Sequence, residues 1–133
     1  MPRYMLDTNI CIYLMKNQPE QVARRFAMCF VGDVVMSAIT FAELEYGVTV
    51  SANRARERRS LAALVADIPV VAFDAMAASA YGPIRAATRE HKKDQLDKLI
   101  AAHAVALKVV LVTNNERDFV VYPGVTIENW VTE

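Results

Sequence analysis

The sequence predicts an α/β protein, an α/β/α sandwich whose central parallel sheet has four to five strands. Short apolar runs of strand length alternate along the chain with longer segments of helical periodicity. The apolar runs are continuous, which is typical of parallel strands that are covered on both faces. The chain has 133 residues, of which 54% are hydrophobic. Residues 1–133 are therefore expected to form a single domain around one core.

In the first half of the chain, strands are predicted where apolar runs precede a polar residue or follow a turn. They cover residues 3–6 and 34–38. Helices are predicted over residues 9–16, from Pro19, from Thr40 and over residues 51–67. Pro19 suits the first turn of a helix, and Val22, Phe26 and Phe30 recur behind it at four-residue spacing. Gly47 is expected to break or end the helix that Thr40 opens.

In the second half of the chain, the same alternation continues. Strands are predicted over residues 69–73, 109–113 and 125–130. Helical segments are predicted from Asp74, over residues 97–107 and over residues 116–119. Asp74 is a typical helix cap, and Gly82–Pro83 is expected to interrupt the helix that it opens. The polar residues 91–95 are predicted to form a loop before Asp97.

Composition limits the functions that the chain can have. Lys and Arg number 15 and so do Asp and Glu, so the net charge is zero and any nucleic-acid binding must use a local patch. The N-terminus has no signal pattern, and no apolar run reaches the ~18 residues of a membrane span, so we expect a cytoplasmic protein without a membrane partner. Cys11 and Cys29 fit no zinc or redox spacing and are expected to be reduced and buried.

Three acidic residues are predicted to meet at one edge of the sheet. Asp7 directly follows the first strand, and Glu43 lies just beyond the second. Asp97 begins the helix that leads into the fourth strand, and this helix must run antiparallel to that strand. Its N-terminus therefore lies at the edge where the strands end, together with Thr113 and Asn115. Open α/β sheets bind ligands at this edge.

Carboxylates that crowd together repel one another, and a divalent cation relieves the repulsion. Oxygen ligands without His or Cys at ligand spacing favour Mg²⁺, or Mn²⁺, over zinc. Such an ion polarises a phosphoryl oxygen and lowers the pKa of a bound water, which suits phosphodiester hydrolysis. Each acid also has a structural interpretation. Asp7 and Asp97 fit helix caps, and Thr40 with Glu43 fits an S/T-x-x-E capping box.

Four segments, in order, resemble the motifs of PIN-domain toxins of the VapC type. They are Met5–Ile12 (MLDTNICI), Ser37–Gly47 (SAITFAELEYG), Asp97–Ala104 (DKLIAAHA) and Val112–Phe119 (VTNNERDF). Together they span nearly the whole chain. The resemblance implies a Mg²⁺-dependent endoribonuclease that forms a homodimer and is neutralised by a cognate antitoxin. It also points to tRNA or another structured RNA as the substrate.

The resemblance assigns catalytic and metal-binding roles to Asp7, Glu43 and Asp97. Asp7 and Asp97 are expected to hold Mg²⁺, directly or through water, while Glu43 orients or deprotonates the attacking water. Supporting positions are assigned to Thr113, Asn115, Asp118 and Asn9.

The sequence departs from the family pattern after the fourth strand. Many PIN domains have a fourth acid there, but this chain has Asn115, with Glu116 and Asp118 as candidates to replace the missing charge. Whether one or two metal ions bind therefore stays open. Asp94 is a rival to Asp97 for the third acid, although Asp97 fits the Leu-Ile-Ala-Ala that follows better.

Two basic runs are candidates for contacts with phosphate. The run at residues 54–59 is interpreted as a solvated helix face that pairs with nearby acids such as Glu57. The second run leads into Asp97 and is the candidate RNA-binding surface: Arg85, Arg89, Lys92 and Lys93. His103 is interpreted as a packed or surface-paired residue, and Trp130 as an anchor against the core. Residues 12–15 fit either the core or an interface with a dimer partner or antitoxin.

Two other classes of protein compete with the nuclease. A phospho-acceptor receiver domain would use Asp74 as its acceptor, but it would also have paired acids after the first strand and a Lys after the last. A degenerate PIN-like binding module would have lost its acids, whereas Asp7, Glu43 and Asp97 are all present.

Overall fold

A parallel sheet forms the centre of the computed structural model, which describes residues 1–93 and 95–132. Within these residues the sheet has five strands in the order β3-β2-β1-β4-β5, all parallel. The strands are β1 (Tyr4–Leu6), β2 (Val34–Ser37), β3 (Val70–Val71), β4 (Val110–Val112) and β5 (Ile127–Glu128). The predicted parallel sheet of four to five strands is confirmed, although the strands at its two edges are shorter than predicted.

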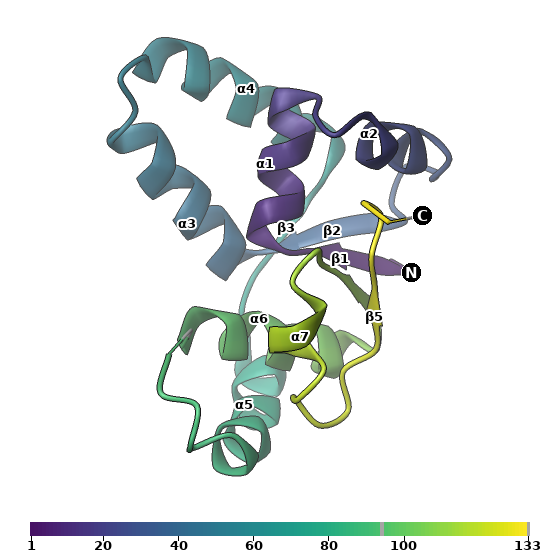
Figure 1. Ribbon diagram of the computed structural model, residues 1–133, viewed down its shortest axis with the longest axis vertical. Coiled ribbons are helices and arrows are strands. Elements are labelled where there is room, and N and C mark those ends of the chain that lie inside the picture. The colour runs from purple at the N-terminus through teal and green to yellow at the C-terminus, as the bar shows by residue number, and fades with distance from the viewer. Residues whose placement is uncertain (94, 133) are drawn as a thin grey trace.

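Helices cover both faces of this sheet, so the predicted α/β/α sandwich is confirmed (Figure 1). The helices in the described part of the chain are α1 (Thr8–Lys16), α2 (Glu20–Ala27), α3 (Ala38–Thr49), α4 (Arg54–Asp67), α5 (Ala75–Ala87), α6 (Gln95–Leu107) and α7 (Glu116–Phe119). In Figure 1, α1 to α4 lie on one side of the sheet and α5 to α7 on the other. None of the helices among residues 1–93 and 95–132 is long and apolar enough to cross a membrane.

Adjacent residues of each central strand point into different hydrophobic clusters. Leu6, on β1, belongs to the cluster beneath α1 to α4, while its neighbour Met5 belongs to the cluster beneath α5 and α6. On β4, Val112 and Leu111 divide between the two clusters in the same way. Because both faces are buried, every position of these strands must be apolar, which explains the continuous apolar runs in the sequence.

Four helices begin at a polar side chain that accepts a hydrogen bond from a backbone N–H in the first turn. These caps are Asp7 for α1, Ser37 for α3, Asn53 for α4 and Asp74 for α5. The helix predicted from Thr40 therefore begins at Ala38, and Thr40 is a buried residue of its first turn rather than part of a capping box. Gly47 lies inside α3 and does not end it.

The predicted interruption near Gly82–Pro83 is wrong, because α5 continues through both residues to Ala87. A proline in a helix clashes with the Cβ of the preceding residue, and Gly82 has none. The carbonyl of Ser79, which loses its partner N–H at Pro83, belongs to an exposed residue. Both causes make the proline tolerable at this position.

The apolar residues at four-residue spacing after Pro19 continue beyond the end of the helix that they predict. Helix α2 ends at Ala27, and Phe30 is 80% exposed, so only Val22 is fully buried and Phe26 partly buried. The chain turns after α2 because Gly32 adopts a φ of +92° and the Asp33 carboxylate accepts a hydrogen bond from the Phe30 N–H. The hydrophobic period therefore ends where the turn begins.

The C-terminal segment is attached to the core through Trp130, which is fully buried. Its indole lies edge-on to Tyr4, with ring centroids 5.4 Å apart, and its Nε1 donates to Glu128 Oε1 at 2.8 Å. The Arg25 guanidinium lies over the indole at 5.1 Å and donates to the Tyr4 hydroxyl at 3.0 Å. The structure thus confirms Trp130 as an anchor, with Arg25 of α2 as its partner.

Cys11 and Cys29 are both free thiols. Cys11 is buried as predicted, while Cys29 is only partly buried beside Arg25.

Candidate functional site

Two of the predicted acids lie together at the carboxyl edge of the sheet. Asp7 follows β1 and is only 4% exposed. Its Oδ1 accepts a hydrogen bond from the Ile10 N–H at 2.9 Å and so caps α1. Glu43 lies on α3, where its Oε1 accepts a hydrogen bond from the Thr8 hydroxyl at 2.5 Å. Because Thr8 directly follows Asp7, this bond holds Glu43 beside the junction of β1 and α1.

The environment of Asp7 disfavours its negative charge. Burial is the main cause and the charge of Glu43 adds to it, so the pKa of Asp7 rises from 3.8 to about 6. The Thr113 hydroxyl and the backbone N–H groups of Ile10 and Asn9 act in the opposite direction, because they donate hydrogen bonds to the carboxylate. These hydrogen bonds therefore orient the carboxylate, but they do not outweigh the cost of burying its charge.

A chain of hydrogen bonds leads from Asp7 to α7. Thr113 is fully buried behind β4, donates to Asp7 and accepts from the Asn115 N–H at 2.9 Å. The Asn115 side chain in turn donates from Nδ2 to Asp118 Oδ2 at 2.7 Å. Asn115 thus connects two carboxylates where the family pattern has an acid, and Asp118 brings a negative charge to the same loop.

Asp97 lies in the first turn of α6 and is partly buried. Since α6 leads into β4, its N-terminus is at the carboxyl edge of the sheet, as the sequence predicts. Within residues 1–93 and 95–132, no group of three His, Cys, Asp or Glu side chains is arranged to hold a metal ion. The structure therefore brings Asp7 and Glu43 together but does not place Asp97 in one cluster with them. Its rival Asp94 lies outside the described residues.

The pair formed by Asp7 and Glu43 fits a magnesium ion. Mg²⁺ is bound in proteins by oxygen, often through one or two carboxylates, while it keeps several of its waters. Both donors here are carboxylates, and burial together with the charge of Glu43 raises the pKa of Asp7. A divalent cation between the two carboxylates would supply that charge.

The remaining candidates are less closely tied to this pair. The side chain of Asn9 is exposed, so its contribution to Asp7 comes from its backbone N–H. Asp74 is exposed, and its Oδ1 accepts a hydrogen bond from the Ala77 N–H at 3.0 Å, so it acts as the predicted helix cap. His103 is 1% exposed, with Nδ1 2.8 Å from the Ser37 Oγ. Burial lowers the pKa of its imidazole, so it is a packed residue, as predicted.

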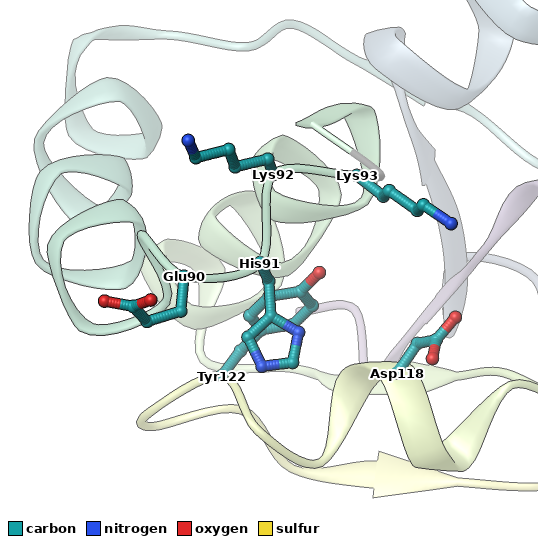
Figure 2. Close-up of a pocket in the computed structure, with 6 residues that line it drawn as sticks. All are labelled: Glu90, His91, Lys92, Lys93, Asp118 and Tyr122. Atoms are coloured by element: carbon teal, nitrogen blue, oxygen red, sulfur yellow. The ribbon is translucent and has the colours of Figure 1, made fainter.

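The basic runs occupy different surfaces. In the first run, Arg58 donates to Glu45 of α3 at 2.9 Å, so its partner is Glu45 and not Glu57. In the second run, Arg85 and Arg89 are exposed around the end of α5, and the Arg85 guanidinium lies over the Tyr81 ring. Lys92 and Lys93 are exposed in the loop before α6 and line a pocket that Asp118 also lines (Figure 2).

Sequence reasoning missed two residues that organise the site. Thr8 holds Glu43, and its place directly behind Asp7 was the available signal. Lys98 is 1% exposed, and its Nζ donates to the carbonyl oxygens of Thr88 and His91. It thereby fastens the loop that contains Lys92 and Lys93 to α6. A lysine near the start of a helix gives no sequence signal that distinguishes such a buried anchor from a surface charge.

Replacing Thr113 is expected to raise the pKa of Asp7 above its present value of about 6. In Thr113→Val the carboxylate loses a hydrogen-bond donor that favours its charged form. A ¹³C NMR titration of the Asp7 carboxyl in metal-free protein measures the change. Thr113→Ser keeps the hydroxyl and serves as the control. An unchanged Asp7 titration in Thr113→Val would show that the hydroxyl does not act on this group.

The chain is similar to known proteins over nearly its whole length. The PIN domain family model matches residues 4–124. A protein of Shigella flexneri named tRNA(fMet)-specific endonuclease VapC is 38% identical over 132 residues, which cover 98% of this chain and 99% of the relative.

Solved structures of complexes show the same likeness. The crystal structure of DNA-bound VapBC from Salmonella typhimurium contains a chain that superimposes with a TM-score of 0.90 at 37% identity, covering 98% of this chain and 99% of its own. A toxin–antitoxin complex from Klebsiella pneumoniae contains a chain with a TM-score of 0.71 at 25% identity, covering 92% of this chain and 95% of its own.

Proposed function

The chain belongs to the VapC group of the PIN-domain family, and from this premise we propose that it is a magnesium-dependent endoribonuclease and the toxin of a toxin–antitoxin pair. The observation that carries the proposal is the pair of carboxylates, Asp7 and Glu43, at the carboxyl edge of the sheet. These two residues would hold Mg²⁺, with Asp97 contributing through a bound water. A bound Mg²⁺ supplies a Lewis acid that polarises a phosphoryl oxygen and lowers the pKa of a coordinated water.

The neighbouring side chains orient Asp7 and Glu43 for the proposed hydrolysis. Thr113 and the N-terminal backbone N–H groups of α1 fix the Asp7 carboxylate. Thr8 occupies Glu43 Oε1, and Glu43 Oε2 is the oxygen proposed to orient the attacking water and accept its proton. No side chain needs to act as a covalent nucleophile. The fully buried Thr113 limits the movement of Asp7, as a positioned catalytic group requires.

The proposed substrate is a structured RNA, and tRNA is the first candidate because a relative with 38% identity is named a tRNA(fMet)-specific endonuclease. The net charge of zero offers no general attraction for RNA. The exposed cations in the last turn of α5 and in the segment that follows it are proposed to provide it: Arg85, Arg89, Lys92 and Lys93.

The proposed antitoxin site is a pocket of about 520 Å³ between α1, α3 and α4. Apolar side chains such as Ile12, Met15 and Val48 line it together with Glu43. A segment of a partner protein in this pocket would cover Glu43 and so block the acidic pair. Similar proteins are seen in VapBC complexes, which supports an antitoxin as the occupant. We also propose a homodimer, with Tyr46 and Met76 among the exposed side chains available for contact.

The direct test is to incubate purified protein, free of any antitoxin, with total cellular RNA and Mg²⁺ and to map the new 5′ ends. Cleavage at a few sites that EDTA abolishes is the expected result. Absence of cleavage by a folded preparation would overturn the nuclease proposal and favour a degenerate binding module. In that case Asn115, which replaces the fourth acid, would be the first residue to restore to Asp.

Replacing Asp97 is expected to lower cleavage by about 10- to 100-fold, the usual cost of losing a residue that supports a metal site from its outer shell. In Asp97→Asn the shape of the side chain stays and only the charge is lost. Initial rates at saturating Mg²⁺ are compared with wild type, and thermal melting verifies the fold. Asp67→Asn, the same substitution at an exposed position at the end of α4, is the control. A wild-type rate for a folded Asp97→Asn protein would refute the role of Asp97.

A further inference from the structure

A second pocket lies beside the proposed catalytic site, between the loop before α6 and the segment around α7. It measures about 430 Å³ and is lined by Glu90, His91, Lys92, Lys93, Asp118 and Tyr122. A pocket of this size is large enough for a small organic ligand. Both of its walls lead to the catalytic residues. One wall continues into α6 and Asp97, and the other contains Asp118 at the end of the hydrogen-bond chain from Asp7.

A buried lysine anchors the loop that forms one wall of the pocket. Lys98 is buried and donates to the carbonyl oxygens of Thr88 and His91. Thr88 is the C-cap of α5 and also donates its hydroxyl to the Ile84 carbonyl at 2.7 Å. The backbone that leads from α5 into the basic loop is therefore anchored to α6 through Lys98.

The chemistry of the lining is ordered along the pocket. Figure 2 shows Lys92 and Lys93 pointing toward opposite ends, with the rings of His91 and Tyr122 between them. Asp118 lies at the same end as Lys93, and Glu90 lies at the end toward which Lys92 points. Tyr122 is 4% exposed and packs edge-on against Phe119, so it forms a rigid floor. His91 is exposed and its ring is available to a ligand.

This order matches one nucleotide within an RNA chain. Such a unit has a phosphate on each side and a planar base with a ribose between them. An ammonium group at each end suits the two phosphates, and aromatic rings suit the base. Each end also has a carboxylate, which accepts hydrogen bonds from hydroxyl or amino groups.

We propose that this pocket is a nucleotide subsite that holds one residue of the RNA chain next to the scissile phosphate. Lys92 and Lys93 bind the flanking phosphates, and the base lies against His91 above the Tyr122 floor. Lys98 acts as a positioning residue that shapes the subsite through the loop backbone. This inference rests on the proposed ribonuclease function, because RNA is the ligand, but its test does not depend on cleavage.

The test measures binding of a short, fluorescein-labelled single-stranded oligoribonucleotide of mixed sequence by anisotropy, in EDTA and between about 50 and 200 mM KCl. Each lysine that binds a phosphate contributes about 0.7 to the slope of log K against log salt on a single strand. Lys92→Gln and Lys93→Gln are therefore each expected to reduce the slope by about 0.7. His91→Ala is expected to weaken binding by about fivefold or more at every salt concentration without changing the slope.

Lys108→Gln is the matched control, because Lys108 is exposed at the opposite edge of the sheet, between α6 and β4. Its φ of +59° is equally strained with either side chain, so the substitution changes only the charge. A slope that falls equally in Lys108→Gln, or that stays at the wild-type value in Lys92→Gln and Lys93→Gln, would overturn the subsite. If the lysine variants behave as expected but the wild-type protein cleaves no RNA with Mg²⁺, the subsite stands and the nuclease proposal fails.

Discussion

Asp7→Asn is expected to abolish RNA cleavage while leaving the fold intact. The substitution removes one of the two charges proposed to hold Mg²⁺, and with the ion several kcal/mol of charge stabilisation are lost, which corresponds to about 100-fold or more in rate. Asparagine is as good a helix cap as aspartate, so α1 keeps its bond from the Ile10 N–H. Its side-chain oxygen can also still accept from Thr113. Initial rates at saturating Mg²⁺ measure the loss of cleavage, and thermal melting curves show whether the fold is intact.

Asp74→Asn is the matched control for this variant. Asp74 also follows a strand and also caps a helix, through the Ala77 N–H at 3.0 Å, but it lies exposed and away from the acidic pair. The Asp74→Asn protein should cleave RNA at the wild-type rate. If Asp74→Asn loses as much activity as Asp7→Asn, the effect comes from helix capping and not from the acidic site.

Asp7→Asn should also change how the stability of the protein depends on pH when Mg²⁺ is absent. The pKa of Asp7 is raised from 3.8 to about 6, so the folded protein binds its proton more tightly than the unfolded chain does. The contribution of Asp7 to stability therefore falls as pH rises through the window from about 4 to about 6 and stays low above it. At about 1.4 kcal/mol per pKa unit, the total loss is up to about 3 kcal/mol.

In EDTA at pH 7.5, Asp7→Asn should therefore unfold at higher denaturant concentration than wild type, and the difference should shrink toward pH 4. Denaturation at several pH values measures this. A variant that is less stable than wild type at pH 7.5 would mean that the buried carboxylate is stabilised by its hydrogen bonds and does not need a cation. The magnesium site would then lose its main physical support.

How much of the fold could be predicted depends on whether the signal is local. The continuous apolar runs predict a covered parallel sheet because Met5 and Leu6, one residue apart, must both be buried on opposite faces. Phe30 shows the limit of periodicity, since a side chain at helical spacing is exposed once the turn at Gly32 intervenes. Pro83 shows another limit, because the preceding glycine lets α5 continue through it.

In the candidate site, too, local sequence signals predict some features and not others. Asp7 could be located because it ends a strand, and the topology of a parallel sheet places Glu43 at the same edge. The bond from Thr8 to Glu43 joins positions 35 residues apart in the sequence, and no local pattern specifies it. The same holds for Lys98, whose burial depends on the end of α5 and on the loop that packs over it. Residue types thus predict the chemistry, while the contacts that orient it appear only in the fold.

The largest effect on stability is expected at Trp130. Trp130→Ala removes a fully buried indole and should cost about 3–5 kcal/mol, which is a large share of the roughly 5–15 kcal/mol that stabilise a domain. It also deprives Glu128 of a donor at 2.8 Å and Arg25 of the ring beneath it. The melting temperature should fall by roughly 10 °C or more. Trp130→Phe keeps most of the packing and should lose much less.

Trp130→Ala should also lower activity at the candidate site. Asn129, the residue before Trp130, is hydrogen-bonded to the loop that leads to this site. Asn129 Nδ2 donates to Asn114 Oδ1 and to Glu116 Oε2, both at 3.1 Å, and so holds the loop that follows β4. That loop also contains Thr113 and Asn115, which lead to Asp7 and Asp118. Below its melting temperature, Trp130→Ala should therefore cleave RNA more slowly than Trp130→Phe. Equal rates in the two folded variants would show that β4 alone is sufficient to position Thr113.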